Sequence, residues 1–451
     1  MDIKVAEKLI NRHLSGHNEI IKNAEIADRY YRNKTDILLP NRKSEDKDTT
    51  PLHNADNRVC SSFYSLLVNQ KSSYIFTSPP LFDVGNTTSN EIVSNVLGDN
   101  FAKRCKDLCI NAANGGIAWV HYWSDENDDF KYGVLDARQV IPIWSDDLER
   151  RLLGVLRTYK KIDENGDSFI VYELWNDREC SVYKRTFVDD ENMVLIPYEC
   201  FYINDKQMSV FQHDFGKVPF IPFANNNLCT SDLDSIKGLI DTYDKTYSGF
   251  ANDLEDIQEV IFVLSGYSGT ELKSFLADLK KYKTVKLDGG DDLGSGGSLS
   301  TLTIDIPVEA REKLLSMTRK AIFEQGQGVD PDPQRFGDTS GEALKYLYSL
   351  LELKSGLLET EFRPGFSELI TAICEFKKVS CGKITQTWTR TCISNDKELA
   401  EIIQKSDGII SNRTLVERHP LVENADIELQ RIKEEQDELM QRDEKAMFGG
   451  E

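Results

Sequence analysis

The sequence predicts an α+β protein in which long helices stand beside a separate antiparallel β region. Apolar residues recur at helical intervals from Val5 to about Tyr31 and again in several later stretches. Short runs rich in Val, Ile, Tyr, Phe and Trp, broken by turn residues, fill the interval from 117 to 223. At 451 residues the chain is too long for one ordinary compact core, so we expect two or more substructures.

Composition limits the possible functions. Hydrophobic residues at 40% and charged residues at 29% are typical of a globular protein. The 75 acidic against 54 basic residues give a net charge of -21, which argues against tight wrapping of nucleic acid. This charge suits a protein that never meets DNA, or one that lets DNA slide past without sticking.

Cysteine spacing and hydropathy indicate a soluble protein from a reducing compartment. The nine cysteines have no CxxC spacing, so we expect reduced thiols. No stretch of 18 apolar residues occurs and the first residues lack a signal-peptide pattern, so we expect no membrane span and no secretion.

Helical periodicity and turn signals divide the first half of the chain. After the helix from Val5 to Tyr31, a second helix is predicted from Asp56 to Thr77, where two prolines follow, and a third from Ser89 to Ala113. The β-rich interval then predicts an antiparallel meander, with a clear turn at 163–166.

The next segment carries ten large apolar residues that step alternately by three and four. They are Leu233, Ile236, Ile240, Tyr243, Tyr247, Phe250, Leu254, Ile257, Ile261 and Leu264. This heptad seam predicts one helix from Ser231 to Leu264, roughly 50 Å long, that ends before Gly266. We expect its Asp-rich remaining face to meet solvent or another subunit. Bulky rings within the seam disfavour a dimeric zipper and favour a bundle or ring of packed helices.

A small α/β module and a second long helix follow the seam. A helix is predicted over 270–281, strands over 284–287 and 301–306, and a flexible run between these strands. Pro307 then opens a helix that ends near Gly326. Its apolar stripe consists of Ala310, Leu314, Met317 and Ala321. Two long helices therefore bracket one small module.

The rest of the chain is predicted to be mainly helical. A loop from Gly328 to Ser340 leads to a helix through Ala343 and Phe362, which Pro364 and Gly365 should kink or break. A strand over 385–392, a helix over 397–405 and a charged helix from about 426 complete the prediction.

No pattern of a catalytic, metal or cofactor site stands out. Phosphate loops, zinc-protease motifs, nucleophile elbows and dinucleotide fingerprints are absent from the sequence. His13 and His17 lie four apart on a helix without further ligands, and the run 288–292 lacks the ligand pattern of an EF-hand. We predict no catalytic residue, no metal and no cofactor.

Several strings, taken in order, resemble the portal proteins of tailed phages, in particular siphophages of Gram-positive hosts. They are DRYYRNKTDIL, NRVCSSFYSLLVNQKSSYIFTSPP, LDARQVIPIWSDD, GVLRTY, GKVPFIPFANN, SDLDSIKGLIDTYDKTYSGFANDLED, TLTIDIPVEAREKLL, GQGVDP and FGDTSGEALKYLYSLLELK. The resemblance extends to about Glu435 and implies the mostly helical portal fold.

The resemblance implies a division of the chain into named parts. The wing would comprise 1–230, with its helices and β meander, and 341–395, with a helix and a strand. The stem helices would be 231–267 and 307–327, the clip 268–306, the tunnel loop 328–340, and the crown and tail 396–451. The seam residues would join neighbouring subunits in the stem. The tunnel-loop residues toward DNA would be Gly328, Val329, Asp330, Asp332, Gln334, Arg335, Phe336 and Gly337.

The resemblance also implies a function and partners. The chain would form a homo-oligomeric ring, a dodecamer, at one capsid vertex, and double-stranded DNA would pass through it without sequence specificity during packaging and ejection. The large terminase, then the head–tail adaptor, would dock on it, and the major capsid and scaffolding proteins would surround it. It would assemble in the host cytoplasm and remain in the virion, with no membrane partner and no enzymatic activity.

Two other functions are compatible with parts of the sequence. A scaffolding or tether protein could use the heptad seam for coiled-coil assembly and have no channel. A metal-dependent enzyme could act at the acidic loops, but the sequence lacks a convergent set of His and carboxylate ligands.

Overall fold

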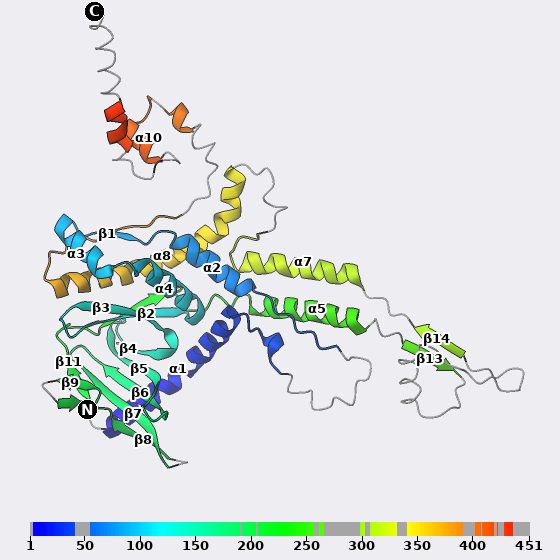
Figure 1. Ribbon diagram of the computed structural model, residues 1–451, viewed down its shortest axis with the longest axis horizontal. Helices are drawn as coiled ribbons and strands as arrows, with labels where there is room; N and C mark the ends of the chain where they lie inside the picture. Colours follow the sequence, from blue (N-terminus) through cyan, green and yellow to red (C-terminus); the bar gives the residue numbers. More distant parts are fainter. Residues whose placement is uncertain are drawn as a thin grey trace, which may run out of the picture.

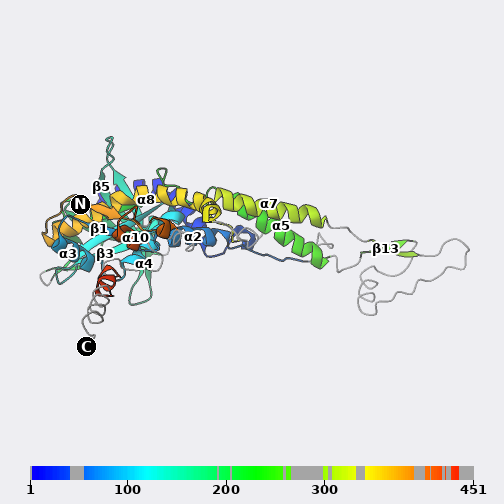
Figure 2. The ribbon, with the colours of Figure 1, turned by 90° about the horizontal axis from the view of Figure 1, so that it is seen from above.

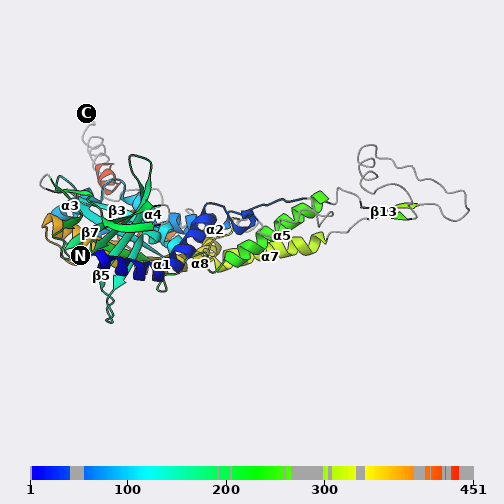
Figure 3. The ribbon, with the colours of Figure 1, turned by 90° about the horizontal axis from the view of Figure 1, so that it is seen from below.

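A computed structural model describes residues 3–40, 55–189, 192–203, 206–256, 261–265, 298–302, 307–331 and 341–390, with 402–406, 408–418, 422 and 428–435 nearer the C-terminus. The fold is α+β, as predicted: a body of helices and antiparallel sheets carries a projecting helix pair. The pair consists of α5 (Lys237–Asp256) and α7 (Val308–Gln325), which lie side by side and run in opposite directions (Figures 1 and 3). Figure 2 shows that the pair projects from the body along the long axis of the molecule.

The helices agree with the prediction in part, because one begins later than predicted, one predicted helix is divided in two and the helix over 412–418 was not predicted. They are α1 (Ile3–Tyr31), α2 (Phe63–Ile75), α3 (Thr87–Leu97), α4 (Phe101–Gly115), α8 (Gly341–Lys377) and α10 (Asn412–Arg418), with short 3-10 turns at Asp36–Leu38 and Ala137–Gln139. The single helix predicted over 89–113 is wrong, because Gly98 adopts a φ of 68° and ends α3 before α4 begins. No helix within these described ranges is long and apolar enough to cross a bilayer.

The β region is the predicted antiparallel meander. Its strands are β2 (Ile117–Ser124), β3 (Phe130–Asp136), β4 (Val140–Trp144), β5 (Leu152–Ile162), β6 (Ser168–Trp175), β7 (Glu179–Asp189), β8 (Asn192–Pro197), β11 (Val210–Gln212) and β12 (Phe220–Ala224). One sheet has the order β12-β2-β3 and the other β11-β7-β6-β5-β4, with β8 also paired to β7. Aromatic and β-branched residues fill the space between the two sheets, with Trp119, Val155 and Phe220 fully buried.

Three short two-stranded ladders complete the sheets. The pairs are β1 (Leu81–Asp83) with β15 (Thr385–Thr387), β9 (Phe201–Ile203) with β10 (Lys206–Met208), and β13 (Ile261–Ser265) with β14 (Ser298–Leu302). The predicted strand over 385–392 is thus shorter, and its last two residues lie outside the described ranges. Helical residues at 402–405 and 428–435 agree with the two helices predicted near the C-terminus.

The long helix predicted across the seam is wrong at both ends. Residues 232–236 form turns, α5 ends at Asp256, and Ile261–Ser265 is strand β13. The β-branched run around Ile261 pairs with β14, so ladder hydrogen bonds replace helical ones there. The helix predicted over 270–281 and the strand over 284–287 lie outside the described residues.

Helix α8 continues through Pro364, so the predicted break does not occur there. Its buried side chains include Leu358, Phe362 and Phe366, which pack with Phe223 of β12. This packing on both sides of the proline compensates for the helical hydrogen bond that proline cannot donate. The N-terminal part of α8 turns away from the rest in Figure 1.

Two glycines of α8 should respond in opposite ways to alanine. A Cβ on Gly365 would lie 2.8 Å from the Phe223 ring, whereas one on Gly356 would meet nothing within 4 Å. We therefore expect Gly365→Ala to destabilise the fold by about 1–3 kcal/mol through overpacking. Gly356→Ala, the matched control, should stabilise it by about 0.5–1 kcal/mol through helix propensity. Chemical denaturation would measure both, and equal effects would contradict the close approach of α8 and β12.

Candidate functional site

The candidate functional site is the base of the α5–α7 pair, where α2, α8 and the start of the loop after α7 meet. We call it the junction. Its polar members are Gln70, Lys71, Asn225, Asp232, Arg319, Asp330 and Lys354. The site brings together segments that are far apart in the sequence, including the first residues of the predicted tunnel loop.

The first three seam residues belong to the core of the single chain. Leu233, Ile236 and Ile240 are buried among side chains of α1, α2 and α4, including Tyr30 and Tyr64. Side chains buried in this way cannot contact another copy of the protein. The heptad pattern here therefore reflects attachment of α5 to the body.

The remaining seam residues fall into four groups. Tyr243 and Phe250 are half-buried, whereas Tyr247 and Leu254 are 43% and 48% exposed. Ile257 lies outside the described residues, and Ile261 and Leu264 are in β13, where only the backbone is described. The seam is thus not one continuous face, and its assigned role in assembly remains a prediction for the seven seam residues after Ile240.

Aromatic and ionic contacts hold α5 against α7. The ring of Phe63 in α2 lies edge-on to Tyr243 of α5 at 4.9 Å and to Phe323 of α7 at 5.9 Å, so it wedges into the base of the pair. Farther out, Arg311 of α7 forms an ion pair with Asp253 of α5. On α7, Leu314 and Met317 of the predicted stripe remain 44% and 61% exposed.

The polar face of α5 binds a segment of its own chain, which corrects the expectation of solvent or another subunit. Asp244 of α5 is buried and accepts a hydrogen bond from the Thr35 hydroxyl at 2.6 Å. The backbone N–H groups of Asn57, Val59 and Ser61 donate to the side chains of Asn252, Ser248 and Asp244 at 2.6, 3.0 and 3.0 Å. This anchoring explains why α2 starts at Phe63 and not at the predicted Asp56.

A buried carboxylate lies at the centre of the junction. Asp232 is 3.1 Å from the ammonium groups of both Lys71 and Lys354, and it accepts a hydrogen bond from Asn225 at 2.8 Å. Burial alone would raise the pKa of Asp232, but the two lysines outweigh it and hold the pKa well below its usual range. Burial lowers the pKa of Lys354, against the opposing effect of Asp232. The lysines thus stabilise the ionised carboxylate.

The junction also fixes the end of α7. Lys354 donates to the carbonyl of Gly326 at 2.9 Å, where the helix dipole favours a cation. A Cβ on Gly328 would lie 2.1 Å from the Leu67 side chain of α2, so only glycine allows this approach. Gly328, the first residue of the predicted tunnel loop, is therefore packed against α2.

Two further contacts hold the first residues of the loop. The Gln70 amide donates to the Val329 carbonyl at 2.7 Å and accepts from the Val329 N–H at 3.0 Å. Arg319 pairs with Asp330 at 2.7 Å, and the Asp330 side chain is only 4% exposed. Asp330 therefore does not contribute a free charge to the loop. The other predicted loop residues lie outside the described ranges: Asp332, Gln334, Arg335, Phe336 and Gly337.

Sequence reasoning missed most of the junction. The sequence pattern did not identify four of its residues, namely Gln70, Lys71, Asp232 and Lys354. Most of their contacts join residues that are more than 100 positions apart in the chain. One signal was present: Lys71 stands on an otherwise apolar or small face of α2. Of the histidine pair, His17 is buried, with its ring Nε2 3.0 Å from the Ala137 carbonyl.

Comparisons with known proteins agree over nearly the whole chain. Residues 10–442 match the family described as "Phage portal protein, SPP1 Gp6-like". The portal protein of Clostridium phage phiCD119 is 41% identical over 441 residues, which cover 94% of each chain. The portal protein of Bacillus phage SPP1 is 30% identical over 451 residues, covering 96% of this chain and 86% of that protein.

Solved structures with a related shape come from the necks of GTA particles. A chain of the empty particle's neck covers 78% of this chain and 88% of its own length, and one of the native particle's neck covers 84% and 94%. Both have a TM-score of 0.47 and 11% sequence identity.

Replacing the central carboxylate should damage the junction. We expect Asp232→Asn to destabilise the protein by about 3–5 kcal/mol at neutral pH, because two buried lysines lose their counter-charge. Asp234→Asn is the matched control, since Asp234 is exposed and only accepts from the Ser231 N–H at 3.2 Å. Urea denaturation would measure both variants.

The same cluster predicts a pH dependence. The pKa of Asp232 in the folded protein lies below the ordinary value of 3.8, so its stabilisation is complete above about pH 5 and is lost as pH falls through 3.8 toward the folded pKa. The stability difference between wild type and Asp232→Asn should therefore shrink below pH 5. A difference that stays constant down to pH 3 would contradict the ionised carboxylate.

Proposed function

The chain belongs to the SPP1 Gp6-like family of phage portal proteins, and from this premise we propose that its copies form a dodecameric ring with a central channel for double-stranded DNA. The portal family is a structural one, so the protein acts as a component of the phage particle. In the proposed ring, each copy contributes its α5–α7 pair to the stem, and α1 to α4, α8 and the two larger sheets to the wing, whereas α10 belongs to the crown.

One observation carries this proposal: the projecting pair displays large apolar side chains that its own chain leaves uncovered. Tyr247 and Leu254 of α5 and Leu314 and Met317 of α7 are each more than 40% exposed. Apolar side chains gathered on a projecting element are typical of surfaces that a further protein covers. Neighbouring copies standing side by side would cover them and close a ring.

The same observations disfavour a coiled-coil scaffold without a channel. The seam does not run along one helix, because α5 has only 20 residues and the first three seam residues, two of which precede α5, belong to the core of the chain. A two-stranded coiled coil needs an uninterrupted seam over several heptads. The sequence relatives are named portal proteins, which favours the ring.

We further propose that the loop 328–340 faces the channel. Its start is held by the junction, so the part beyond residue 331 would be presented from a fixed base. With Asp330 paired to Arg319, the remaining charges of the loop are Asp332 and Asp338 against Arg335, a net charge of -1 per copy. A ring of such loops would repel phosphate weakly and let DNA slide.

Residues 268–306 form the clip in this proposal, the surface on which the large terminase docks during packaging and the head–tail adaptor afterwards. The wing would face the capsid and scaffolding proteins at the portal vertex. Assembly would take place in the host cytoplasm. These partners follow from family membership together with the position of the segment between α5 and α7.

Replacing exposed apolar residues of the α5–α7 pair with aspartate should prevent ring formation. We expect Leu254→Asp and Met317→Asp to leave folded monomers or small oligomers, because a carboxylate buried at every subunit contact costs several kcal/mol per copy. Leu148→Asp is the matched control, since Leu148 is fully exposed in the β4–β5 turn. Size-exclusion chromatography with light scattering and electron micrographs would decide, and normal rings from both variants would refute the stem assignment.

Shortening the loop 328–340 while keeping its first residues should impair DNA packaging but not ring assembly. We expect deletion of residues 332–337, which keeps Val329 and Asp330 in place, to leave rings intact and to reduce the DNase-protected genome per capsid severalfold. Arg335→Glu should have a milder effect, because it removes the one cation of the loop. Full packaging by the deletion variant would place the loop outside the channel.

A further inference from the structure

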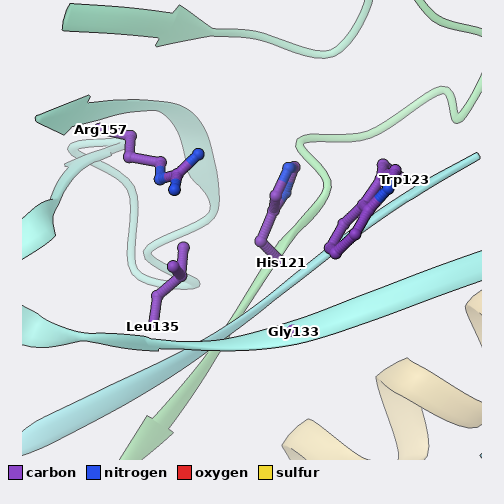
Figure 4. A pocket seen from close by; sticks show the side chains of 5 residues that line it. All are labelled: His121, Trp123, Gly133, Leu135 and Arg157. Atoms are coloured by element: carbon purple, nitrogen blue, oxygen red, sulfur yellow. The ribbon is translucent and has the colours of Figure 1, made fainter. Parts of the chain in front are cut away.

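A cavity of about 300 Å³ opens between the two sheets of the wing, away from the α5–α7 pair. Five residues line it: His121 and Trp123 from β2, Gly133 and Leu135 from β3, and Arg157 from β5 (Figure 4). None of them belongs to the junction or to the proposed channel. The cavity is therefore a separate feature of the wing.

The missing side chain of Gly133 creates this space. Gly133 lies opposite His121 in the β2–β3 register, on the face that looks toward the other sheet. A Cβ on Gly133 would meet only the Trp123 ring, at 3.5 Å, and the φ of Gly133 is not positive. Neither the backbone nor the packing thus requires glycine here. A Cβ at this position would make an ordinary van der Waals contact with the Trp123 ring.

His121 supplies a hydrogen-bond acceptor to the cavity. The residue is only 7% exposed, and its ring Nδ1 donates to the Pro219 carbonyl at 2.9 Å. Burial lowers the pKa of His121 to about 4, so the ring is neutral near pH 7. The other ring nitrogen, Nε2, then carries a lone pair, and within the described part of the chain nothing donates to it.

Arg157 supplies donors from the other side. Its Nη1 bonds the Glu173 carboxylate at 3.2 Å, while its Nη2 has no acceptor among the described residues and can donate to the cavity. Its Nε also lacks an acceptor there but is fully buried. Figure 4 shows the guanidinium directed across the cavity toward His121. Because Glu173 already balances the charge of Arg157, a neutral group that both accepts and donates fits better than an anion. A phenol hydroxyl is such a group, and Leu135 and Trp123 offer apolar contact to its ring.

The turn beside the cavity adds a charge preference. Residues 125–129 between β2 and β3 carry four carboxylates, on Asp125, Glu126, Asp128 and Asp129. Lys131 pairs with Asp125 and Lys377 with Asp129, which leaves two carboxylates in excess. Asp129 is four residues from Gly133, about 13 Å along an extended strand. An extended peptide with a ring in the cavity would therefore place a residue four positions away beside this acidic turn.

We propose that the cavity binds a tyrosine side chain of an extended segment from another protein chain, with Lys or Arg about four residues from that tyrosine. The tyrosine hydroxyl donates to His121 and accepts from Arg157, and the basic residue meets the acidic turn. This site is independent of the stem, the loop and the clip.

The test uses the full-length protein and a fluorescein-labelled nonapeptide with a central tyrosine, two glycines on each side and two lysines at each end. Fluorescence anisotropy should show saturable binding. A matched peptide with phenylalanine in place of tyrosine should bind about tenfold more weakly, because it lacks the hydroxyl. A peptide with glutamates in place of the lysines should also bind at least tenfold more weakly in low salt.

Variants of the protein locate the binding to the cavity. Gly133→Leu should abolish binding by filling the space, whereas Gly133→Ala should weaken it only moderately, and circular dichroism checks that both are folded. Independently of any variant, millimolar N-acetyltyrosinamide should displace the peptide, and N-acetylalaninamide should not. Unchanged binding by folded Gly133→Leu, equal binding of the tyrosine and phenylalanine peptides, or no displacement by N-acetyltyrosinamide would each overturn the proposal.

Discussion

The buried ion cluster around Asp232 is the interaction on which the arrangement of helices depends. Removing a carboxylate and two ammonium groups from water is costly, and only good mutual geometry offsets the cost. Asp232 just before α5, Lys71 in α2 and Lys354 in α8 therefore have to keep their positions relative to one another. Since Lys354 also bonds the last turn of α7, the same cluster sets where the projecting pair leaves the body.

Helix α2 connects the ion cluster to the first residues of the loop after α7. Within little more than one turn, Leu67 packs on Gly328, Gln70 bonds the Val329 backbone and Lys71 joins the ion cluster. Residues three and four apart share one helix face, so a single face of α2 contacts both the base of the α5–α7 pair and the first residues of the loop after α7. A movement of the loop base would therefore disturb α2 and, through Lys71, the start of α5.

The sequence was a good guide wherever local pattern decides the structure. The meander, α1 and the helix opened by Pro307 followed from periodicity and turn residues. The predictions were wrong where residues distant in the sequence decide the local structure. Ile261 lies in a strand because β14 pairs with it, and residues 57–61 cover the polar face of α5. The junction was missed for the same reason, because no spacing rule relates Lys71 to Asp232 or Lys354. Of the predicted loop, only the base can be compared, and Asp330 is buried there.

The distribution of charge allows firm attachment of the α5–α7 pair together with the weak DNA contact of the proposed ring. Three buried carboxylates face a counter-charge: Asp232 faces its two lysines, Asp330 faces Arg319 and Glu173 faces Arg157. The excess of 75 acidic over 54 basic residues must then act mostly at the surface, where salt screens it within about 8 Å. In the proposed ring, DNA would meet this screened repulsion and not the buried pairs. Passage of the phosphate backbone would therefore leave the ion pairs that position α5, α7 and the loop base undisturbed.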